Sequence, residues 1–182
     1  HTLALRVSPK GGAILKKRLE AGRQLFNACL GEGLERLKKA RESKLWQQAR
    51  LARTKTKRAK LFREAQIIYK LSDYDLQAFA IQTKNACCLK EHLDSNTAQK
   101  IATRVYAAIS QYMFGKRGRP RFKAKGQYRS LEGKSNAAGI RFKEAKFVWG
   151  SLKLNPLFDH KDKHGIERHA LKCQTKYVRL LC

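Results

Sequence analysis

The chain has 182 residues, of which 41 are lysine or arginine and 14 are aspartate or glutamate, so its formal net charge at pH 7 is +27. A compact body with that charge repels itself, and its natural partner is a polyanion: nucleic acid first, and an anionic membrane surface a distant second. A hydrophobic content of 42% excludes wholesale disorder. No run approaches the about 18 apolar residues that a membrane span needs, and no signal peptide is visible, so we expect a cytoplasmic protein without a membrane partner.

The cysteines show no paired spacing, which predicts reduced and mostly buried thiols. There are five of them: Cys29, Cys87, Cys88, Cys173 and Cys182. The chain starts with a histidine rather than a methionine and ends inside a predicted strand, so we expect it to be part of a longer protein. Nothing in the sequence indicates an oligomeric state.

At the N-terminus, Thr2 to Ser8 alternate apolar and polar residues, as a half-buried strand does, and Pro9 follows as a helix start. From Gly12 to Ala40, apolar residues recur at spacings of three and four, which predicts a long amphipathic helix. Three glycines mark kinks or close-packing positions in it: Gly22, Gly31 and Gly33.

A second helix is predicted over Ser43 to Lys70, and its polar face is cationic with only Glu64 nearby to offset it. Charges of one sign on a helix face are unfavourable for solubility alone, so the pattern favours contact with a phosphate backbone. The candidates for that contact are Arg50, Arg53, Lys57 and Arg58.

Ser72 and Asp75 form a short version of a capping box and predict a third helix that runs to about Leu93. Asp94 or Ser95 then caps a fourth helix, which stops at Gly115. The connection between these two helices is short, and the helices are therefore expected to pack against each other as a pair.

A basic segment without acidic residues follows Gly115, and Pro120 prevents the helix from continuing into it. Phe122 and Tyr128 lie among its cations, and we expect these rings to stack on bases while the cations hold phosphates. The cations are Lys116, Arg117, Arg119, Arg121, Lys123, Lys125 and Arg129.

After Glu132 the pattern becomes that of strands, at residues 140–143, 146–154 and 169–181, with turns at Gly150 and Pro156. Several short strands of this kind suggest a small barrel. The sequence thus predicts an α+β protein whose helices lie between a first strand and a later β half.

The order of these features resembles the TnpB (OrfB) proteins of insertion sequences and the compact type V CRISPR effectors related to them. The resemblance is carried by Arg119-Pro120-Arg121-Phe122-Lys123 downstream of Gln99, and more weakly by Phe26-Asn27, which is similar to an aromatic-Asn pair in the family's first recognition helix. A core phenylalanine beside a satisfied asparagine explains that pair equally well.

The resemblance implies a helical recognition lobe inserted into a small OB-like wedge β-barrel, followed in the family by a RuvC-like nuclease domain that this chain lacks. Residues 1–9 would supply a wedge strand, residues 10–115 the recognition lobe, and residues 116–182 the rest of the wedge barrel. Closure of the barrel by the first strand is likewise what the resemblance implies.

Family members read a short motif in duplex DNA that flanks the target. Carried over by position, the reading residues are Ser95, Asn96 and Gln99 on the fourth helix and Ser130 after the basic segment. Asparagine and glutamine can bond adenine bidentately, and serine can bond either base type. The alternative is that Asp94 and Ser95 merely cap the helix and that Gln99 is exposed.

A RuvC-like nuclease needs metal ions between carboxylates, and the acids of this chain are scattered beside cap and turn signals instead. We therefore expect no catalytic residue and no cofactor here; Mg²⁺ belongs to a full-length nuclease, if the whole protein is one rather than a binding-only relative. The histidines and cysteine between residues 160 and 173 lack the paired spacing of zinc ligands, so no metal site is predicted: His160, His164, His169 and Cys173.

The partners expected from this reading are a guide RNA and a target DNA, in a transposon or CRISPR defence context, in prokaryotic cytoplasm near the nucleoid. Two alternatives remain open. A generic RNA-binding protein predicts the same salt-sensitive binding but no dependence on a flanking motif, and a helix-turn-helix transposase predicts binding to duplex DNA without RNA.

Overall fold

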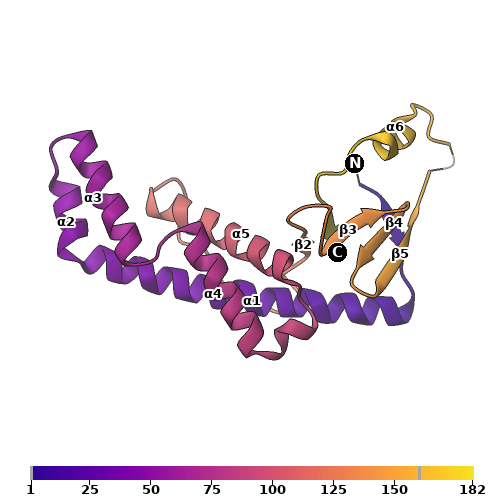
Figure 1. Ribbon diagram of the computed structural model, residues 1–182, viewed down its shortest axis with the longest axis horizontal. Coiled ribbons are helices and arrows are strands. Elements are labelled where there is room, and N and C mark those ends of the chain that lie inside the picture. Colours follow the sequence, from indigo (N-terminus) through magenta and orange to yellow (C-terminus); the bar gives the residue numbers. More distant parts are fainter. Residues whose placement is uncertain (1, 160) are drawn as a thin grey trace.

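A computed structural model describes residues 2–159 and 161–182, which form an α+β protein with most of its helices at one end and its strands at the other (Figure 1). Helix α1 (Pro9–Glu42) runs along the molecule from the sheet to the far helical end. The other long helices pack on it or beyond its end: α2 (Lys44–Leu51), α3 (Lys55–Ile68), α4 (Asp73–Ala86) and α5 (Ser95–Met113).

The first predicted helix is confirmed as α1. The hydroxyl of Ser8 accepts a hydrogen bond from the Gly11 amide, and Pro9 occupies the first turn, where its missing N–H costs nothing. Two of the three glycines are close-packing positions: a Cβ on Gly22 would lie 2.7 Å from Leu131, and one on Gly33 would overlap Ile109. The sequence patterns of a helix start and an apolar stripe are local, and they predict this element correctly.

The single helix predicted over residues 43–70 is wrong, because the chain breaks at Ala52, whose backbone is extended. The hydroxyl of Thr54 caps the new helix α3 by accepting from the Lys57 amide. Helix α3 folds back on α2 so that the Trp46 and Phe62 rings meet edge to face, with centroids 4.8 Å apart. The aromatic contact and the cap stabilise a hairpin that helical spacing alone does not reveal.

The capping box is confirmed, since the Ser72 hydroxyl accepts from the Asp75 amide and the Asp75 carboxylate accepts from the Ser72 amide. Helix α4 ends at Ala86, earlier than predicted, and a 3-10 turn η1 (Cys88–Glu91) leads to α5. Asp94 caps α5 by accepting from the Thr97 amide at 2.9 Å. Helices α4 and α5 pack against each other, as the short connection predicts.

Strand β1 (Ala4–Arg6) pairs antiparallel with β5 (Leu152–Leu157), so residues from both sides of the helical region share one sheet. The strand order is β1-β5-β4-β3, with β4 (Lys146–Trp149) and β3 (Ile140–Lys143) completing it. A second pair is formed by β2 (Ser130–Glu132) and β6 (Arg179–Leu181).

Within the described residues these strands do not close into a barrel, which corrects the predicted closure. The outer edge of β3 is met by a side chain instead of a strand: Asn136 Nδ2 donates to the Phe142 carbonyl and Asn136 Oδ1 accepts from the Phe142 amide, at 2.9 and 2.7 Å. The Asn136 amide itself donates to the Lys176 carbonyl in the chain that leads to β6. One asparagine therefore links the two sheets at a position where a closed barrel would need backbone hydrogen bonds between two strands.

The strand predicted from His169 to Leu181 is also wrong over most of its length. Residues Ile166–Lys172 form helix α6. Of the predicted strand, only Arg179–Leu181 is a strand, β6. Gly165 adopts the left-handed conformation with φ of 65°, and the Asp162 carboxylate accepts from the Glu167 and Arg168 amides. This cap favours a helix where the apolar alternation predicts a strand.

A short polar network joins the helices to the sheet. Asp94 accepts from the indole Nε1 of buried Trp149 at 2.8 Å, and Arg18 donates to the Trp149 carbonyl at 2.8 Å while its guanidinium lies 4.4 Å from the ring centroid. The cap of α5 is thus also an anchor for β4. None of the described helices is both long enough and apolar enough to cross a membrane.

Candidate nucleic-acid interface

The basic segment, residues 116–129, has no regular secondary structure, and α1 fixes its course. Asn27 Nδ2 donates to the Lys123 carbonyl at 2.9 Å, and the Lys123 amide donates to Asn27 Oδ1 at 2.8 Å. Arg23 Nη1 donates to the same carbonyl at 2.9 Å. The side-chain amide of Asn27 thereby makes the pair of hydrogen bonds that a neighbouring strand would make. It holds the backbone of the segment at Lys123 and leaves the charged side chains of the segment available.

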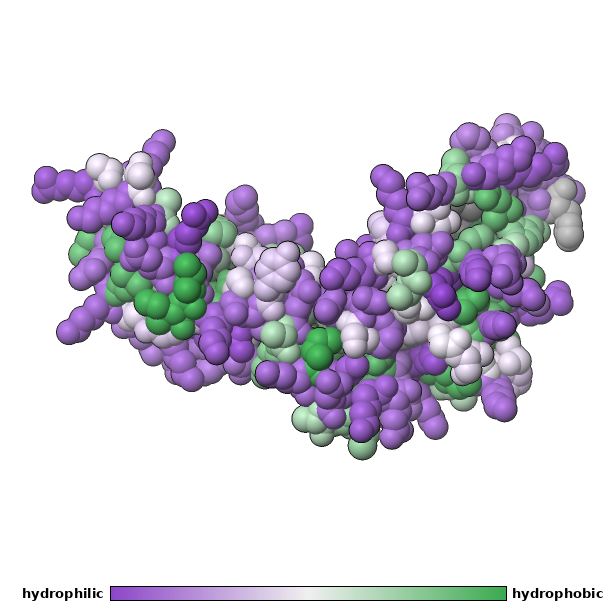
Figure 2. All heavy atoms as spheres, viewed as in Figure 1, coloured by the Kyte–Doolittle hydropathy of each residue, from purple (hydrophilic) through white to green (hydrophobic). Residues whose placement is uncertain are grey.

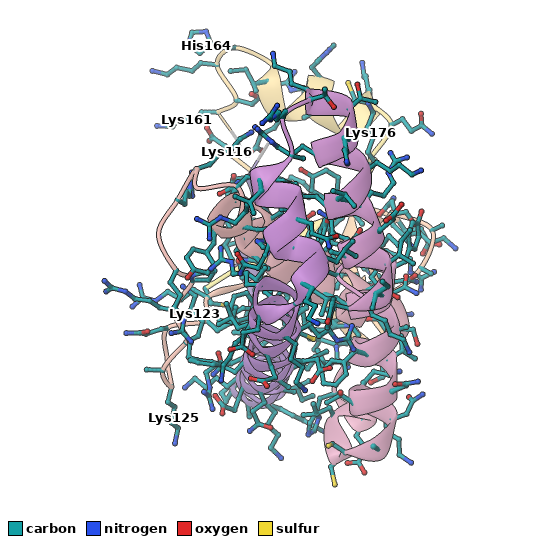
Figure 3. The ribbon with its side chains drawn as sticks, turned by 90° about the vertical axis from the view of Figure 1, so that its left-hand side faces the viewer. Lys116, Lys123, Lys125, Lys161, His164 and Lys176 are labelled. Atoms are coloured by element: carbon teal, nitrogen blue, oxygen red, sulfur yellow. The ribbon has the colours of Figure 1, made fainter. Side chains whose placement is uncertain are left out.

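Most of the cationic side chains of the segment are exposed. Figure 3 shows Lys123 and Lys125 along one margin of the molecule, beside the helices. Lys123 is half-buried, and the other six cations of the segment are exposed, as is Phe122 at 55%. No hydrogen bond or ion pair holds the side chains of Lys123 and Lys125 within the described part of the chain, so their charges are available to a ligand.

The predicted stacking role of Tyr128 does not fit its position, because its side chain is only 7% exposed. The ring packs against Phe26 with centroids 5.5 Å apart, and the Arg104 guanidinium lies 5.5 Å from its centroid. Burial raises the pKa of Tyr128 to about 12. Tyr128 and Phe26 are core residues under the basic segment, and Phe122 is the ring of the segment that faces solvent.

At the start of α5, lysines engage two of the four residues that the sequence proposes for base reading. Lys84, only 7% exposed, donates to the Ser95 hydroxyl oxygen at 3.1 Å. Lys134 donates to Gln99 Oε1 at 2.9 Å. Each lysine uses one of the two lone pairs on its acceptor oxygen, so Ser95 and Gln99 each keep one lone pair and their protons for a ligand. Bidentate pairing of Gln99 with adenine would use the second lone pair of Oε1 together with an Nε2 proton.

The other two reading candidates are held less directly. Asn96 is half-buried beside Ser95 on the first turn of α5. Ser130 begins β2, and its carbonyl accepts from Arg104 Nη1 of α5 at 3.0 Å. That bond ties β2 to Arg104, which lies in α5 beyond the candidate residues. The three helical candidates, Ser95, Asn96 and Gln99, lie in the first two turns of α5.

The four cations predicted on the second helix are all exposed: Arg50, Arg53, Lys57 and Arg58. Arg58 donates through Nη2 to the Ala52 carbonyl at 2.9 Å and lines a groove of about 650 Å³ between α3 and the end of α5. Phe114 lines the same groove, and its position after the last turn of α5, next to Gly115 and Lys116, is the signal that sequence reasoning overlooked.

A second groove of about 430 Å³ lies between α1, the end of α5 and the basic segment. Phe122 and Arg119 line it together with Glu35 and Glu42 of α1, so its charges are of both signs. Figure 2 shows one face of the molecule as largely hydrophilic, with hydrophobic side chains gathered over the α2–α3 end and over the sheet.

The cysteines differ from the prediction of mostly buried thiols. Cys29 is buried, and burial raises its pKa to about 12, whereas the other four cysteines are exposed. Cys87 and Cys88 follow the end of α4 rather than lying in its apolar face. Among the residues that the structure describes, no group of three or more His, Cys, Asp or Glu side chains could hold a metal ion; His160 lies outside them.

Comparisons with known proteins give no match: no family model matches the chain, and neither does any curated protein or solved structure.

Proposed function

We propose that this chain is the guide-RNA- and target-DNA-binding part of an RNA-guided DNA-targeting protein, of the TnpB or compact type V CRISPR kind. The observation that carries nucleic-acid binding is the fixed course of the basic segment. Asn27 and Arg23 hold the backbone at Lys123, and cations project to solvent on both sides of that point.

Holding the segment in place lowers the cost of binding. A flexible basic tail loses conformational freedom when it binds, while a segment already tied to α1 loses less. Contacts between its cations and phosphates release counterions and position the nucleic acid without reading its sequence. Phe122 adds an exposed ring on which an unpaired base can stack.

Sequence reading is proposed for the start of α5, where Ser95, Asn96 and Gln99 lie together, with Ser130 on the adjoining strand. Lys84 and Lys134 each occupy one lone pair of the Ser95 and Gln99 oxygens, so these side chains can meet bases as donors and through one remaining acceptor lone pair each. Donors select acceptor atoms such as guanine O6 and N7 or thymine O4 in the major groove. A helix N-terminus that enters this groove is an established geometry for such contacts.

In this proposal residues 10–115 serve as the recognition lobe, and the two sheets serve as the OB-like wedge that holds guide RNA. Any nuclease centre, with its Mg²⁺, belongs to a part of the protein outside this chain. The whole protein then either cleaves DNA or only binds it, and the binding part described here serves both cases.

The proposal is tested by purifying the protein from its own host and sequencing the RNA that survives a high-salt wash. The expected result is one discrete structured RNA that ends in a segment complementary to DNA. A mixture of ribosomal and transfer RNA would instead indicate a generic RNA-binding protein, and tight binding to duplex DNA after removal of RNA would indicate a DNA-binding transposase domain. Either result overturns the RNA-guided assignment.

A charge variant tests the interface itself. Replacing Lys116, Lys123 and Lys125 together by glutamine is expected to reduce the slope of log affinity against log salt by about 2, since each single-strand phosphate contact contributes about 0.7. A matched variant replaces Lys10, Lys16 and Lys17, which are exposed on the first turns of α1. Equal slopes for the two variants would show that binding follows total charge and not the basic segment.

A further inference from the structure

The groove beside α3 combines an exposed ring with charges that are all positive, whereas the groove beside Phe122 has charges of both signs. The groove beside α3 has a volume of about 650 Å³ and lies between α3 and the residue that follows α5. Its charged and aromatic lining consists of Lys55, Arg58, Lys60, Phe62, Arg63 and Phe114. A volume of this size lies within the range of about 300–1,000 Å³ that small-ligand sites occupy.

The charges that line the groove are all positive. The side chains of Lys55, Lys60 and Arg63 take part in no hydrogen bond or ion pair within the described part of the chain, whereas the Arg58 side chain is fixed by its bond to the Ala52 carbonyl. The groove beside Phe122 has glutamates among its lining residues, and this one has no acidic residue. Its charge is therefore not compensated by the fold, and it complements an anion.

Phe114 provides an apolar face at the same place. Its side chain is 59% exposed, while its amide is held by the Ser110 carbonyl at 3.0 Å, so the ring is presented on a fixed backbone. Across the groove, Phe62 packs against Trp46 and belongs to the α2–α3 hairpin. A solvent-exposed ring beside unpaired cations fits a ligand that has both a flat face and negative charge.

The two walls are connected, and the groove leads towards the basic segment. Gln66 Nε2 of α3 donates to the Met113 sulfur of α5 at 4.0 Å. Beyond Phe114, the amides of Lys116 and Arg117 both donate to the Gln111 carbonyl, which turns the start of the basic segment back over the end of α5. A strand that leaves the groove past Phe114 therefore meets the cations at the start of that segment.

We propose that this groove holds a single-stranded stretch of nucleic acid, with one base stacked on Phe114 and its phosphates on Lys55, Lys60 and Arg63. Stacking requires a base face that is free of its neighbours, which an unpaired strand offers and an intact duplex does not. The inference rests on the proposed function, because it adds a second contact for the nucleic acid that the basic segment binds.

The experiment measures fluorescence anisotropy of a labelled oligothymidylate of about 12 nucleotides, which is within the range of site sizes known for single strands. A blunt duplex of the same length and heparin are the comparison ligands, because neither presents a free base face. Phe114→Ala is expected to weaken binding of the single strand by about 5- to 150-fold, which corresponds to the loss of one stacked base. Its affinity for heparin is expected to stay unchanged.

Phe114→Leu keeps an apolar side chain without a ring and is expected to weaken single-strand binding as Phe114→Ala does. Lys60→Gln is expected to weaken binding of both the single strand and heparin. Its matched control is Lys44→Gln, which removes the same charge from an exposed position on α2 outside the groove. Circular dichroism checks that each variant is folded.

The groove assignment is overturned if Phe114→Ala binds the single strand as the wild type does, if it loses heparin equally, or if Lys44→Gln matches Lys60→Gln. The Lys116, Lys123 and Lys125 variant separates this failure from a failure of the proposed function. Loss of binding in that variant alone refutes only the groove. If the wild-type protein prefers heparin to every oligonucleotide, both the groove and the proposed function fail.

Discussion

Arginine and lysine side chains have different roles at the two ends of α1. Where the helices meet the sheets, they are used by the fold: Arg18 binds the Trp149 carbonyl, Arg104 binds the Ser130 carbonyl, and Arg179 pairs with buried Glu132. At the α2–α3 end, Lys60 and Arg63 extend into a groove with no partner in the described residues. The net charge of the chain is therefore larger than the charge that is available to a ligand.

The position of a cation along the sequence does not indicate whether its side chain is available to a ligand. Arg23 and Lys123 both belong to the basic surface, yet the Arg23 side chain holds the backbone and the Lys123 side chain is offered to solvent. At the junction of helices and sheets the arginines named above support the fold, whereas at the α2–α3 tip Lys60 and Arg63 are available for binding and Arg58 is bound to a carbonyl. The following changes test that division, from the largest expected effect to the smallest.

Trp149→Ala is expected to lower the free energy of unfolding by about 3–5 kcal/mol, because it removes a buried aromatic ring and leaves a cavity. It also removes the indole that donates to Asp94 and the ring that Arg18 covers. Chemical denaturation measures the change. A loss below about 1 kcal/mol would show that the junction is not the stabilising region that its contacts indicate.

Asn27→Asp is nearly isosteric and is expected to lower the free energy of unfolding by about 1–3 kcal/mol, because a carboxylate cannot donate to the Lys123 carbonyl. The basic segment is then released from α1, and trypsin should cut after Arg121 and Lys123 faster than in the wild type. The matched control is Asn85→Asp on α4, which makes the same chemical change at an exposed side chain away from the basic segment. Unchanged proteolysis in Asn27→Asp would contradict the role of Asn27 in holding the segment.

Glu132 predicts an acid sensitivity of the junction. Its burial by itself would raise the pKa, but hydrogen bonds from Lys100 and Arg179 and their charges outweigh burial, so the pKa lies below its ordinary value of 4.5. The ion pairs therefore contribute stability that is fully present above about pH 4.5 and is lost as pH falls through the lowered pKa.

Thermal denaturation of the wild type between neutral and acid pH measures this loss. The Glu132→Gln variant should be less stable at neutral pH, since it leaves Lys100 and Arg179 without their carboxylate, and its stability should depend less on pH below 4.5. Parallel pH profiles for the two proteins would assign the acid sensitivity to other carboxylates.

Leu51→Gln at the tip is expected to change the free energy of unfolding by less than about 0.5 kcal/mol, because the Leu51 side chain is 82% exposed. Chemical denaturation checks this as well. A clear loss would mean that the α2–α3 hairpin depends on packing that its surface position does not indicate, and the contrast between junction and tip would weaken.

The sequence by itself determined the features that depend on neighbouring residues. The helix starts at Ser8, Ser72 and Asp94 follow from side chains that reach amides three residues away, and the long apolar stripe of α1 follows from helical spacing. The cationic segment and the polar residues Ser95, Asn96 and Gln99 at the start of α5 are also visible in the order of residues. Interactions of short range in the chain leave a signature that can be read directly.

Only the tertiary structure decided which of the candidate residues are accessible and how the strands associate. Tyr128 and Phe122 are similar rings six residues apart, yet one packs under Gly22 of α1 and the other faces solvent. The link from Asn136 to Lys176 and the groove beside Phe114 likewise arise from segments distant in sequence. Such contacts form between segments that are far apart in the sequence, so the local spacing of residues does not predict them.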